Sequence, residues 1–296
     1  MESALYLVDD KNIRQPLVHA AMEEYLMLHA DTEAADWLLL YENDPSVVVG
    51  KNQSLYREVN FEYLRAGGLV VRRISGGGTV VHGPGNLCFA FITRFEEFKV
   101  NNYPWFNQRL LDALHARGIP AAFNSRNDIV LNGCKISGNA QFTNRKNLLS
   151  HGTLLIDADL EKLRFALQAN TFPVESKAVA SVRSKVMNVS EISSWKDVSE
   201  WRQFLAASWN AVTTPLPDSA WEIIHQIAQQ KMATTEWIYG RSPKTIISKN
   251  IGQLTIEQGI ITDVDQEPWR TKLVGLPYHW SAIRERFSEE EAIQIF

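Results

Sequence analysis

The chain has 296 residues, of which 45% are hydrophobic, and this length suffices for one large domain or for a large and a small one. Its formal net charge of −4 at pH 7 provides no basic surplus for binding phosphates, so nucleic acid is not an expected partner. The N-terminus has too short an apolar run for a signal peptide, and no stretch approaches the roughly 20 apolar residues of a membrane helix. We therefore expect a soluble, cytoplasmic protein with no membrane partner.

The cysteine content argues against two ways of stabilising a fold. Only Cys88 and Cys134 occur, and neither stands in a CxxC pair or near a histidine at metal-ligand spacing. A disulfide framework and a structural zinc site are therefore not expected, and a reducing compartment fits the chain.

The first half of the chain is expected to combine helices with short strands. Pro16 opens a helical stretch whose apolar stripe contains Leu17, Ala21, Tyr25 and Leu28. Further helices are expected over 57–66 and over 105–117, the second ending at Gly118. Strands are expected at 37–41, 46–49, 68–74, 79–82, 86–93, 129–131, 135–142 and 152–156. Clusters of strands followed by helices favour an α+β sandwich over a doubly wound fold.

From Asp157 onward the pattern is mostly helical. Four tryptophans in this part are interpreted as core residues: Trp195, Trp201, Trp209 and Trp221. A change in composition at 240–243 marks a linker, and beyond it short alternating runs at 245–248, 252–256 and 260–264, with a turn at Gly259, predict a small sheet. Residues 277–296 are expected to be helical. We predict a catalytic domain over 1–240 and a small α+β accessory domain over 241–296.

The segment 72–86 contains the strongest chemical signal in the chain. Two arginines lead into Gly76, Gly77 and Gly78. Successive glycines can expose backbone N–H groups and close around a phosphate, although a tight hairpin between two strands has the same composition. The segment is neither a Walker A loop nor a GxGxxG fingerprint.

A second segment, 125–141, places Lys135 on a predicted strand that ends in Ser137-Gly138. A lysine there can span a phosphate and an adjacent carbonyl oxygen, and a fixed cation stabilises the charge that builds up when a carboxylate attacks the α-phosphate of ATP. Asp128 is a candidate ligand of Mg²⁺ and Asn127 a candidate hydrogen-bond partner. The simpler alternatives are a solvated lysine and an aspartate that caps a turn. The sequence thus predicts an acyl-adenylating enzyme.

An ordered set of motifs resembles the lipoate–protein ligase A family, within the biotin/lipoate protein ligase superfamily. The matching segments are 49–53, 72–80, 85–86, 126–128, 135–140, 151–155, 181–186 and 236–240. The resemblance implies the mixed sheet packed with helices of class II aminoacyl-tRNA synthetases and biotin ligases. It also implies activation of lipoate with ATP to lipoyl-AMP, followed by transfer of the lipoyl group to a lysine of an apo lipoyl domain.

The resemblance assigns roles to particular residues. The nucleotide contacts fall on Arg72, Gly77, Gly78, Thr79, Val80 and Lys135. Lys135 is the expected catalytic residue and contacts both the nucleotide and the lipoyl carbonyl. The acyl substrate is expected against Lys135, Gly76, Gly77, Ser137, Gly138 and His151. Secondary candidates are His82, Asn86, Asn127, Asp128 and Arg183, with Asp128 also the expected Mg²⁺ ligand.

The resemblance further implies lipoate or octanoate as substrate, ATP and Mg²⁺ as cofactors, and apo lipoyl domains of 2-oxoacid dehydrogenase E2 subunits and the glycine cleavage H protein as partners. One position departs from the family, which usually has His-Asp where this chain has His82-Gly83.

Two alternatives remain open from the sequence. The first is an octanoyl or lipoyl transferase of the same fold, which takes the acyl group from a carrier and uses a lysine or a cysteine nucleophile. The chain has Ser125-Arg126-Asn127-Asp128 where cysteine transferases place their nucleophile. Cys134 is expected on the opposite strand face from Lys135, as a buried thiol. The second alternative is a non-catalytic binder of lipoyl domains.

Overall fold

A six-stranded mixed sheet carries the first of two units in the computed structural model, which describes residues 4–296. This first unit consists of the chain up to Pro45, His82–Leu160 and Arg183–Ala228. The sheet order is β10-β11-β6-β2-β1-β13. Its strands are β1 (Ala4–Val8), β2 (Ala35–Glu42), β6 (Asn86–Arg94), β10 (Asn139–Thr143), β11 (Asn147–Leu155) and β13 (Val212–Thr214). The strands β2, β1 and β13 run parallel, and the remaining pairs are antiparallel.

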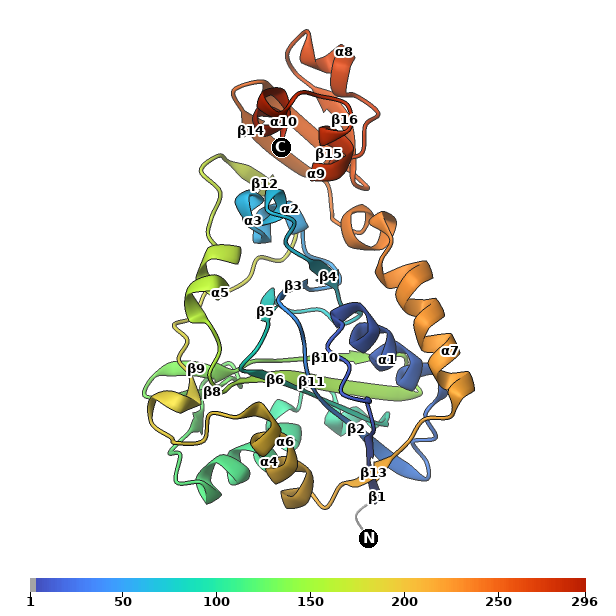
Figure 1. The fold of residues 1–296 in the computed structure, drawn as a ribbon, viewed down its shortest axis with the longest axis vertical. Coiled ribbons are helices and arrows are strands. Elements are labelled where there is room, and N and C mark those ends of the chain that lie inside the picture. Colours follow the sequence, from blue (N-terminus) through green and yellow to red (C-terminus); the bar gives the residue numbers. More distant parts are fainter. Residues whose placement is uncertain (1–3) are drawn as a thin grey trace. The chain divides into compact units, whose positions relative to one another are not determined.

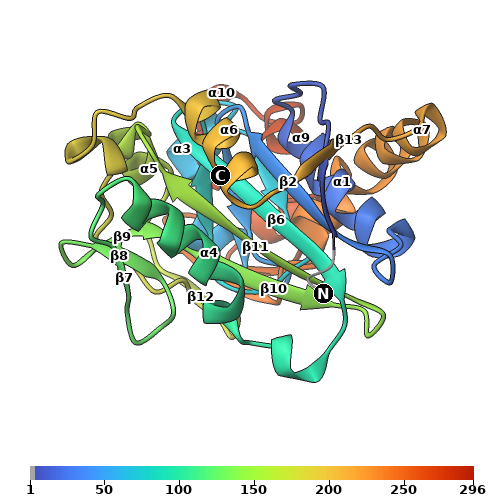
Figure 2. The same cartoon turned by 90° about the horizontal axis from the view of Figure 1, so that it is seen from below.

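Helices cover both faces of this sheet, as Figures 1 and 2 show. They are α1 (Pro16–His29), α4 (Tyr103–Ala116), α6 (Val198–Ser208) and α7 (Asp218–Ile227). The helices α4 and α6 lie on one face and α1 on the other, with α7 packed against α1. Because β6 is covered on both sides, its sequence is a nearly continuous apolar run rather than an alternating one.

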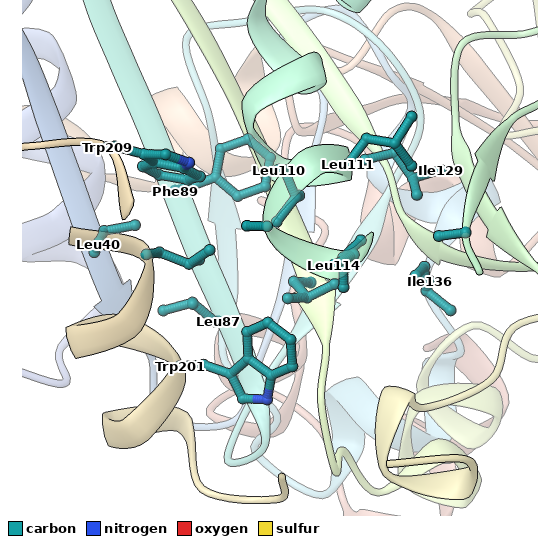
Figure 3. Packing of buried hydrophobic residues seen from close by; sticks show 14 of the residues in the cluster. Leu40, Leu87, Phe89, Leu110, Leu111, Leu114, Ile129, Ile136, Trp201 and Trp209 are labelled. Atoms are coloured by element: carbon teal, nitrogen blue, oxygen red, sulfur yellow. The ribbon is translucent and has the colours of Figure 1, made fainter. Parts of the chain in front are cut away.

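The core of the first unit fills the space between the sheet and the helices α4 and α6. Figure 3 shows Phe89 of the sheet beside Trp209 and Leu110. Trp201 is fully buried in the same cluster, and its indole N–H donates to the carbonyl of Trp195 at 3.2 Å. The interpretation as core residues is confirmed for Trp201 and Trp209, while Trp221 is buried outside this cluster and Trp195 is only partly buried against it. Burying their large apolar surfaces is what attaches the helices to the sheet.

A separate three-stranded sheet of the first unit consists of β7 (Ala122–Phe123), β8 (Ile129–Leu131) and β9 (Cys134–Ser137). The prediction of one strand over 135–142 is therefore wrong. The chain leaves β9 at Gly138 and continues as β10, which pairs with β11 in the large sheet. The break gives Lys135 and Asn139 different neighbours, because they belong to different sheets.

Three strands of the first unit were not predicted from the sequence, namely β1, β7 and β13. The apolar run Ala4–Val8 forms β1, and Val212–Thr214 pairs with it in parallel within a stretch predicted to be mostly helical. The helix 105–117 is confirmed as α4. No helix among residues 4–296 is both long and apolar enough to cross a membrane.

The second unit comprises Ser46–Val81, Glu161–Val182 and Gln229–Phe296. Two sheets lie here, with strand orders β4-β3-β5 and β12-β14-β15-β16. The strands are β3 (Ser46–Val49), β4 (Val70–Arg72), β5 (Val80–His82), β12 (Val174–Ser176), β14 (Thr245–Lys249), β15 (Gly252–Glu257) and β16 (Ile260–Val264). The helices are α2 (Leu55–Glu58), α3 (Phe61–Arg65), α5 (Leu160–Ala166), α8 (Trp269–Leu273), α9 (Trp280–Arg284) and α10 (Glu289–Ile295). Short 3₁₀ or π segments occur at Glu97–Lys99, Val189–Glu191, Ala228–Met232 and Glu236–Gly240.

The predicted small sheet after residue 243 is confirmed, and β12 adds a fourth strand to it from far earlier in the chain. The helix predicted over 57–66 is two short helices, α2 and α3, because Val59 and Asn60 are extended between them. Asn60 caps α3 by accepting a hydrogen bond from the amide of Glu62 at 2.9 Å. The α+β class with a mixed sheet packed by helices is confirmed.

Candidate functional site

The glycine turn (75–78) lies in the second unit directly after β4, and Arg73 shapes it. The guanidinium of Arg73 donates to the carbonyls of Gly76 and Gly78 at 2.6 and 2.7 Å. These bonds turn the carbonyls toward the arginine, and Gly77 adopts a φ of +86°, which favours glycine. Within residues 4–296 the three glycine amides donate no hydrogen bond. The turn therefore presents N–H groups that can bind an anion.

Thr79 follows the turn, and its amide already has a partner within the second unit. The Thr79 N–H donates to Ser181 Oγ at 2.8 Å, and the Gln53 amide donates to the same oxygen at 3.0 Å. Ser181 in turn donates from its N–H and its hydroxyl to the Glu58 carboxylate. A nucleotide contact at Thr79 stays a prediction, and it would require Ser181 to move. The sequence analysis did not single out Gln53, although the residue stands inside the motif at 49–53.

Arg72 is fully buried, and its guanidinium binds backbone carbonyls and one hydroxyl of the second unit. It donates to the carbonyls of Gly50 and Gln53 at 2.9 Å each, to the carbonyl of Ile238 at 2.7 Å and to Ser242 Oγ at 2.9 Å. Burial lowers the pKa of this guanidinium to about 10, so it stays charged at neutral pH. Since its N–H groups are used in this way, a direct contact of Arg72 with a nucleotide stays a prediction that would require this cluster to open.

Lys135 stands on β9 in the first unit, and its ammonium has a defined place. Lys135 Nζ lies 2.8 Å from Asp128 Oδ1, and the lysine side chain is 27% exposed, so a ligand can still reach it. Its backbone is fixed as well, because the amide donates to the carbonyl of Lys185 at 2.8 Å. The side chain crosses Gly138, where a Cβ would stand 2.5 Å from the lysine Cε and Nζ. Glycine at this position therefore makes room for the lysine.

We expect Gly138→Ala to impair activity more than folding. The added methyl group meets the flexible end of Lys135, which can move aside but loses its position. A displacement of about 1 Å at a reacting group can cost about 100-fold in rate, so we expect a loss of that order in adenylate formation. The measurement is pyrophosphate release, with Gly83→Ala as the control. A fully active Gly138→Ala protein would contradict this assignment.

Asp128 does not have the surroundings of a metal ligand. One carboxylate oxygen faces Lys135, and the other accepts a hydrogen bond from Asn124 Nδ2 at 3.2 Å. Arg126 Nε lies 3.9 Å from that second oxygen. The described part of the chain contains no cluster of three histidine, cysteine or acidic side chains that could hold a metal ion. These residues do not fit a Mg²⁺ ion held by the protein itself, because the carboxylate already faces two cations.

Buried polar atoms without a partner flank Lys135 along the chain. Ser137 Oγ and both side-chain amide atoms of Asn139 are buried, and they find no hydrogen-bond partner among residues 4–296. Leaving such groups unpaired costs free energy, about 1–3 kcal/mol per group, which a polar ligand could recover. Ser137 was predicted from the sequence and Asn139 was not, because only the sheet pairing reveals that the Asn139 side chain lies beside Gly152.

His151 of β11 lies on the face of the large sheet that α1 covers. Its Nδ1 is 2.8 Å from Glu23 Oε1, and the Tyr41 hydroxyl donates to the same oxygen at 3.1 Å. Since a carboxylate accepts hydrogen bonds, Nδ1 carries the proton that faces Glu23. A substrate contact at His151 stays a prediction.

His82 ends β5 and also takes part in a buried network. Asn43 Nδ2 lies 2.9 Å from His82 Nδ1, and Asn43 Oδ1 lies 2.7 Å from His19 Nδ1. With the amide donating to His82, the proton of this ring is on Nε2. The secondary role expected for His82 stays a prediction. The next residue is the family departure, Gly83.

We expect Gly83→Asp to be tolerated. A Cβ at this position would find Pro45 Cα at 3.8 Å as its nearest contact, which is an ordinary van der Waals distance. The free energy of unfolding should change by no more than about 0.5 kcal/mol, the usual range for a surface change. Urea unfolding of both proteins measures it, and a loss of about 2 kcal/mol or more would contradict the expected tolerance.

The remaining expected site residues lie in varied surroundings. Val80 is half-buried in β5. Asn86 is buried at the start of β6, where its backbone N–H donates to the carbonyl of Gly83 at 3.1 Å. Asn127 takes a φ of +61° in the turn before β8, a conformation that asparagine tolerates. Arg183 is exposed. Their roles stay predictions.

Comparison with known proteins gives a consistent result. Residues 15–209 match the model of the lipoyl protein ligase A/B catalytic domain. The chain is 40% identical over 249 residues to lipoate-protein ligase LplJ of Bacillus subtilis, covering 81% of this chain and 75% of that protein. It is 37% identical over 243 residues to lipoate-protein ligase 1 of Staphylococcus aureus, covering 80% and 74% respectively.

A solved structure shares the fold. It belongs to a bi-partite lipoate protein ligase from Thermoplasma acidophilum, with a TM-score of 0.67 and 21% identity over 81% of this chain and 97% of that one. The matched family segment contains the glycine turn, Lys135 and His151. On this identity and coverage, the chain belongs to the lipoyl protein ligase A/B family.

Proposed function

We propose that this protein is an AMP-forming lipoate–protein ligase that uses ATP to attach lipoate to a lysine of an apo lipoyl domain. The observation that carries the proposal is the 40% identity to LplJ across 81% of the chain. The position of Lys135 in the structure supports the proposal. Its ammonium faces Asp128, and its side chain passes over Gly138.

The first half-reaction needs positioning and charge rather than an enzyme nucleophile. A carboxylate oxygen of lipoate attacks the α-phosphorus of ATP, the bond from that phosphorus to the bridging oxygen breaks, and pyrophosphate leaves with the electron pair. Negative charge builds up on the phosphoryl oxygens during the attack, and Lys135 supplies the cation that stabilises it. The free amides of the glycine turn supply fixed dipoles for phosphate oxygens.

The second half-reaction transfers the acyl group. The amine nitrogen of the acceptor lysine attacks the acyl carbon of lipoyl-AMP, the bond from that carbon to the phosphate oxygen breaks, and AMP leaves while the nitrogen loses a proton to water. The ammonium of Lys135 can also polarise the acyl carbonyl, because an ammonium has three N–H donors. The unpaired Ser137 Oγ offers a further polar contact to the acyl substrate.

The identity of the substrates and partners is part of the proposal. Lipoate or octanoate would be the acyl substrate, with Ser137, Gly138 and His151 as its proposed contacts in the first unit. The acceptors would be lipoyl domains of 2-oxoacid dehydrogenase E2 subunits and the glycine cleavage H protein. Mg²⁺ would bind together with ATP, through its phosphates, because the residues around Asp128 do not form a site for the ion.

The decisive experiment follows mass and pyrophosphate together. Purified protein is mixed with apo lipoyl domain, lipoate and Mg-ATP, and we expect the domain to gain one lipoyl unit for each pyrophosphate released. Acylation from an octanoyl carrier without ATP would instead establish the transferase. If neither condition gives a product, the remaining alternative is a non-catalytic binder of lipoyl domains.

The cysteines give little support to a cysteine-dependent transferase. Burial raises the pKa of the Cys88 thiol well above its usual range, so this thiol is not a ready nucleophile. Cys134, expected to be buried, is half-buried on β9 and packs against the core of the first unit.

We also propose that residues 241–296 act as an accessory domain to a catalytic domain over 1–240. Support comes from the sheet β14–β16 and the helices α8 to α10, which lie within this segment. In the structure the segment clusters with Ser46–Val81 and Glu161–Val182. Limited proteolysis that cuts first between residues 240 and 243 would support a functional boundary there, and earlier cuts elsewhere would count against it.

A further inference from the structure

The carboxylate of Asp128 is held on both of its oxygens. Lys135 Nζ lies 2.8 Å from Oδ1, while Asn124 Nδ2 donates to Oδ2 at 3.2 Å. Asn124 also accepts from the Asp128 amide at 3.0 Å and from the Arg126 amide at 2.8 Å. The loop before β8 is therefore closed by one asparagine, which fixes where the Asp128 carboxylate stands.

The position of the carboxylate determines the direction of the ammonium. A lysine ammonium has three N–H donors on a flexible stem, and holding it in one place normally costs side-chain entropy. Here Asp128 engages one donor, and Gly138 leaves a slot for the end of the stem. Two donors remain for the phosphoryl oxygen and the acyl carbonyl of the adenylate.

The same contacts disfavour a metal ion at Asp128. A divalent cation bound to Oδ1 would lie beside the Lys135 ammonium, and one bound to Oδ2 would approach Arg126 Nε, which is 3.9 Å from that oxygen. Like charges at such distances repel, and a ligand that already faces two cations is a poor choice for Mg²⁺.

We propose that Asp128, braced by Asn124, is the positioning residue of Lys135 and is not a ligand of the metal ion that accompanies ATP. The proposal rests on the proposed function, since it assigns a role within adenylate formation. It treats Asp128 as acting through Lys135 and not on the substrate directly.

The test separates positioning from metal binding. The full-length proteins with Asp128→Ala and Asp128→Asn are assayed for pyrophosphate release at several Mg²⁺ concentrations. We expect kcat to fall about 100-fold for alanine and about 10-fold for asparagine, whose amide oxygen can still accept from Lys135, while the Mg²⁺ concentration for half-maximal rate stays unchanged. Asn124→Ala removes the hydrogen bonds that hold the loop and the Asp128 carboxylate but keeps the carboxylate itself, so it should give a smaller loss of kcat.

A second readout does not depend on turnover. Binding of Mn²⁺ is followed by electron paramagnetic resonance with a non-hydrolysable ATP analogue present, and we expect the same Mn²⁺ affinity for the wild type and Asp128→Ala. Thermal melting checks that each variant is folded. The matched control is Asp112→Ala, which removes an exposed carboxylate that accepts from Gln108 on α4, and it should leave both readouts unchanged.

Two results would overturn the inference. One is a loss of Mn²⁺ affinity in Asp128→Ala, or recovery of its rate at high Mg²⁺, because either identifies a metal ligand. The other is an unchanged kcat in both Asp128 variants. If the wild-type protein released no pyrophosphate with lipoate, the proposed function itself would fail, and that result is distinguishable from both.

Discussion

Lys135→Ala is expected to lower the rate of adenylate formation by about 100- to 1,000-fold, the usual cost of removing one group that stabilises transition-state charge. The ammonium of Lys135 is a single point charge fixed by Asp128 and Gly138, and no other residue of β9 carries a charge. The measurements are pyrophosphate release and the mass of the lipoyl domain, and both should fall together.

The control for this variant is Lys146→Ala, an exposed lysine in the turn before β11. It should keep the wild-type rate. Lys135→Arg should not rescue the enzyme, because a planar guanidinium does not fit the slot over Gly138 as an ammonium does. A Lys135→Ala protein with more than about a tenth of the wild-type rate would show that the developing charge is stabilised elsewhere.

Arg72→Met is expected to destabilise the protein by about 3–5 kcal/mol, because several buried carbonyls lose their donor at once. The guanidinium is fully buried and binds the carbonyls of Gly50, Gln53 and Ile238. Methionine fills much of the same volume but donates no hydrogen bond. Urea unfolding at neutral pH measures the loss.

The control is Arg57→Met, since Arg57 is exposed and donates to the carbonyl of Ser176 at 3.2 Å. It should change the stability by no more than about 0.5 kcal/mol. If Arg72→Met unfolds like the wild type but has a raised KM for ATP, then Arg72 contacts the nucleotide and the structural role inferred from its burial is wrong.

Local patterns predicted much of the fold. The helix at 105–117 and the small sheet after residue 243 were recognisable because hydrophobic periodicity and turn residues act over short stretches. The strand β13 could not be found in this way. Its three residues are exposed or half-exposed, and they form a strand only because β1 offers an unpaired edge far away in the sequence.

The residues of the candidate site also fall into two groups, those that the sequence identifies and those that only the structure reveals. The glycine turn and Lys135 stood out because glycine and lysine have chemical properties that need no neighbour to be recognised. Their partners did not stand out. Arg73, and not Arg72, holds the turn. Both arginines are buried, and nothing in the adjacent pair distinguishes them before packing gives each its own hydrogen-bond partners.

The sequence by itself determined the family, the α+β class and the residues around which an adenylating site would be built, because ordered motifs and local periodicity carry that information. Only the tertiary structure decided how the polar groups are paired. Asp128 faces Lys135, Ser181 accepts from the Thr79 amide, and the side-chain amide atoms of Asn139 are buried without a hydrogen-bond partner among residues 4–296. These pairings depend on which strands and loops pack together, and short-range sequence patterns do not encode the distance between two side chains that the fold brings together.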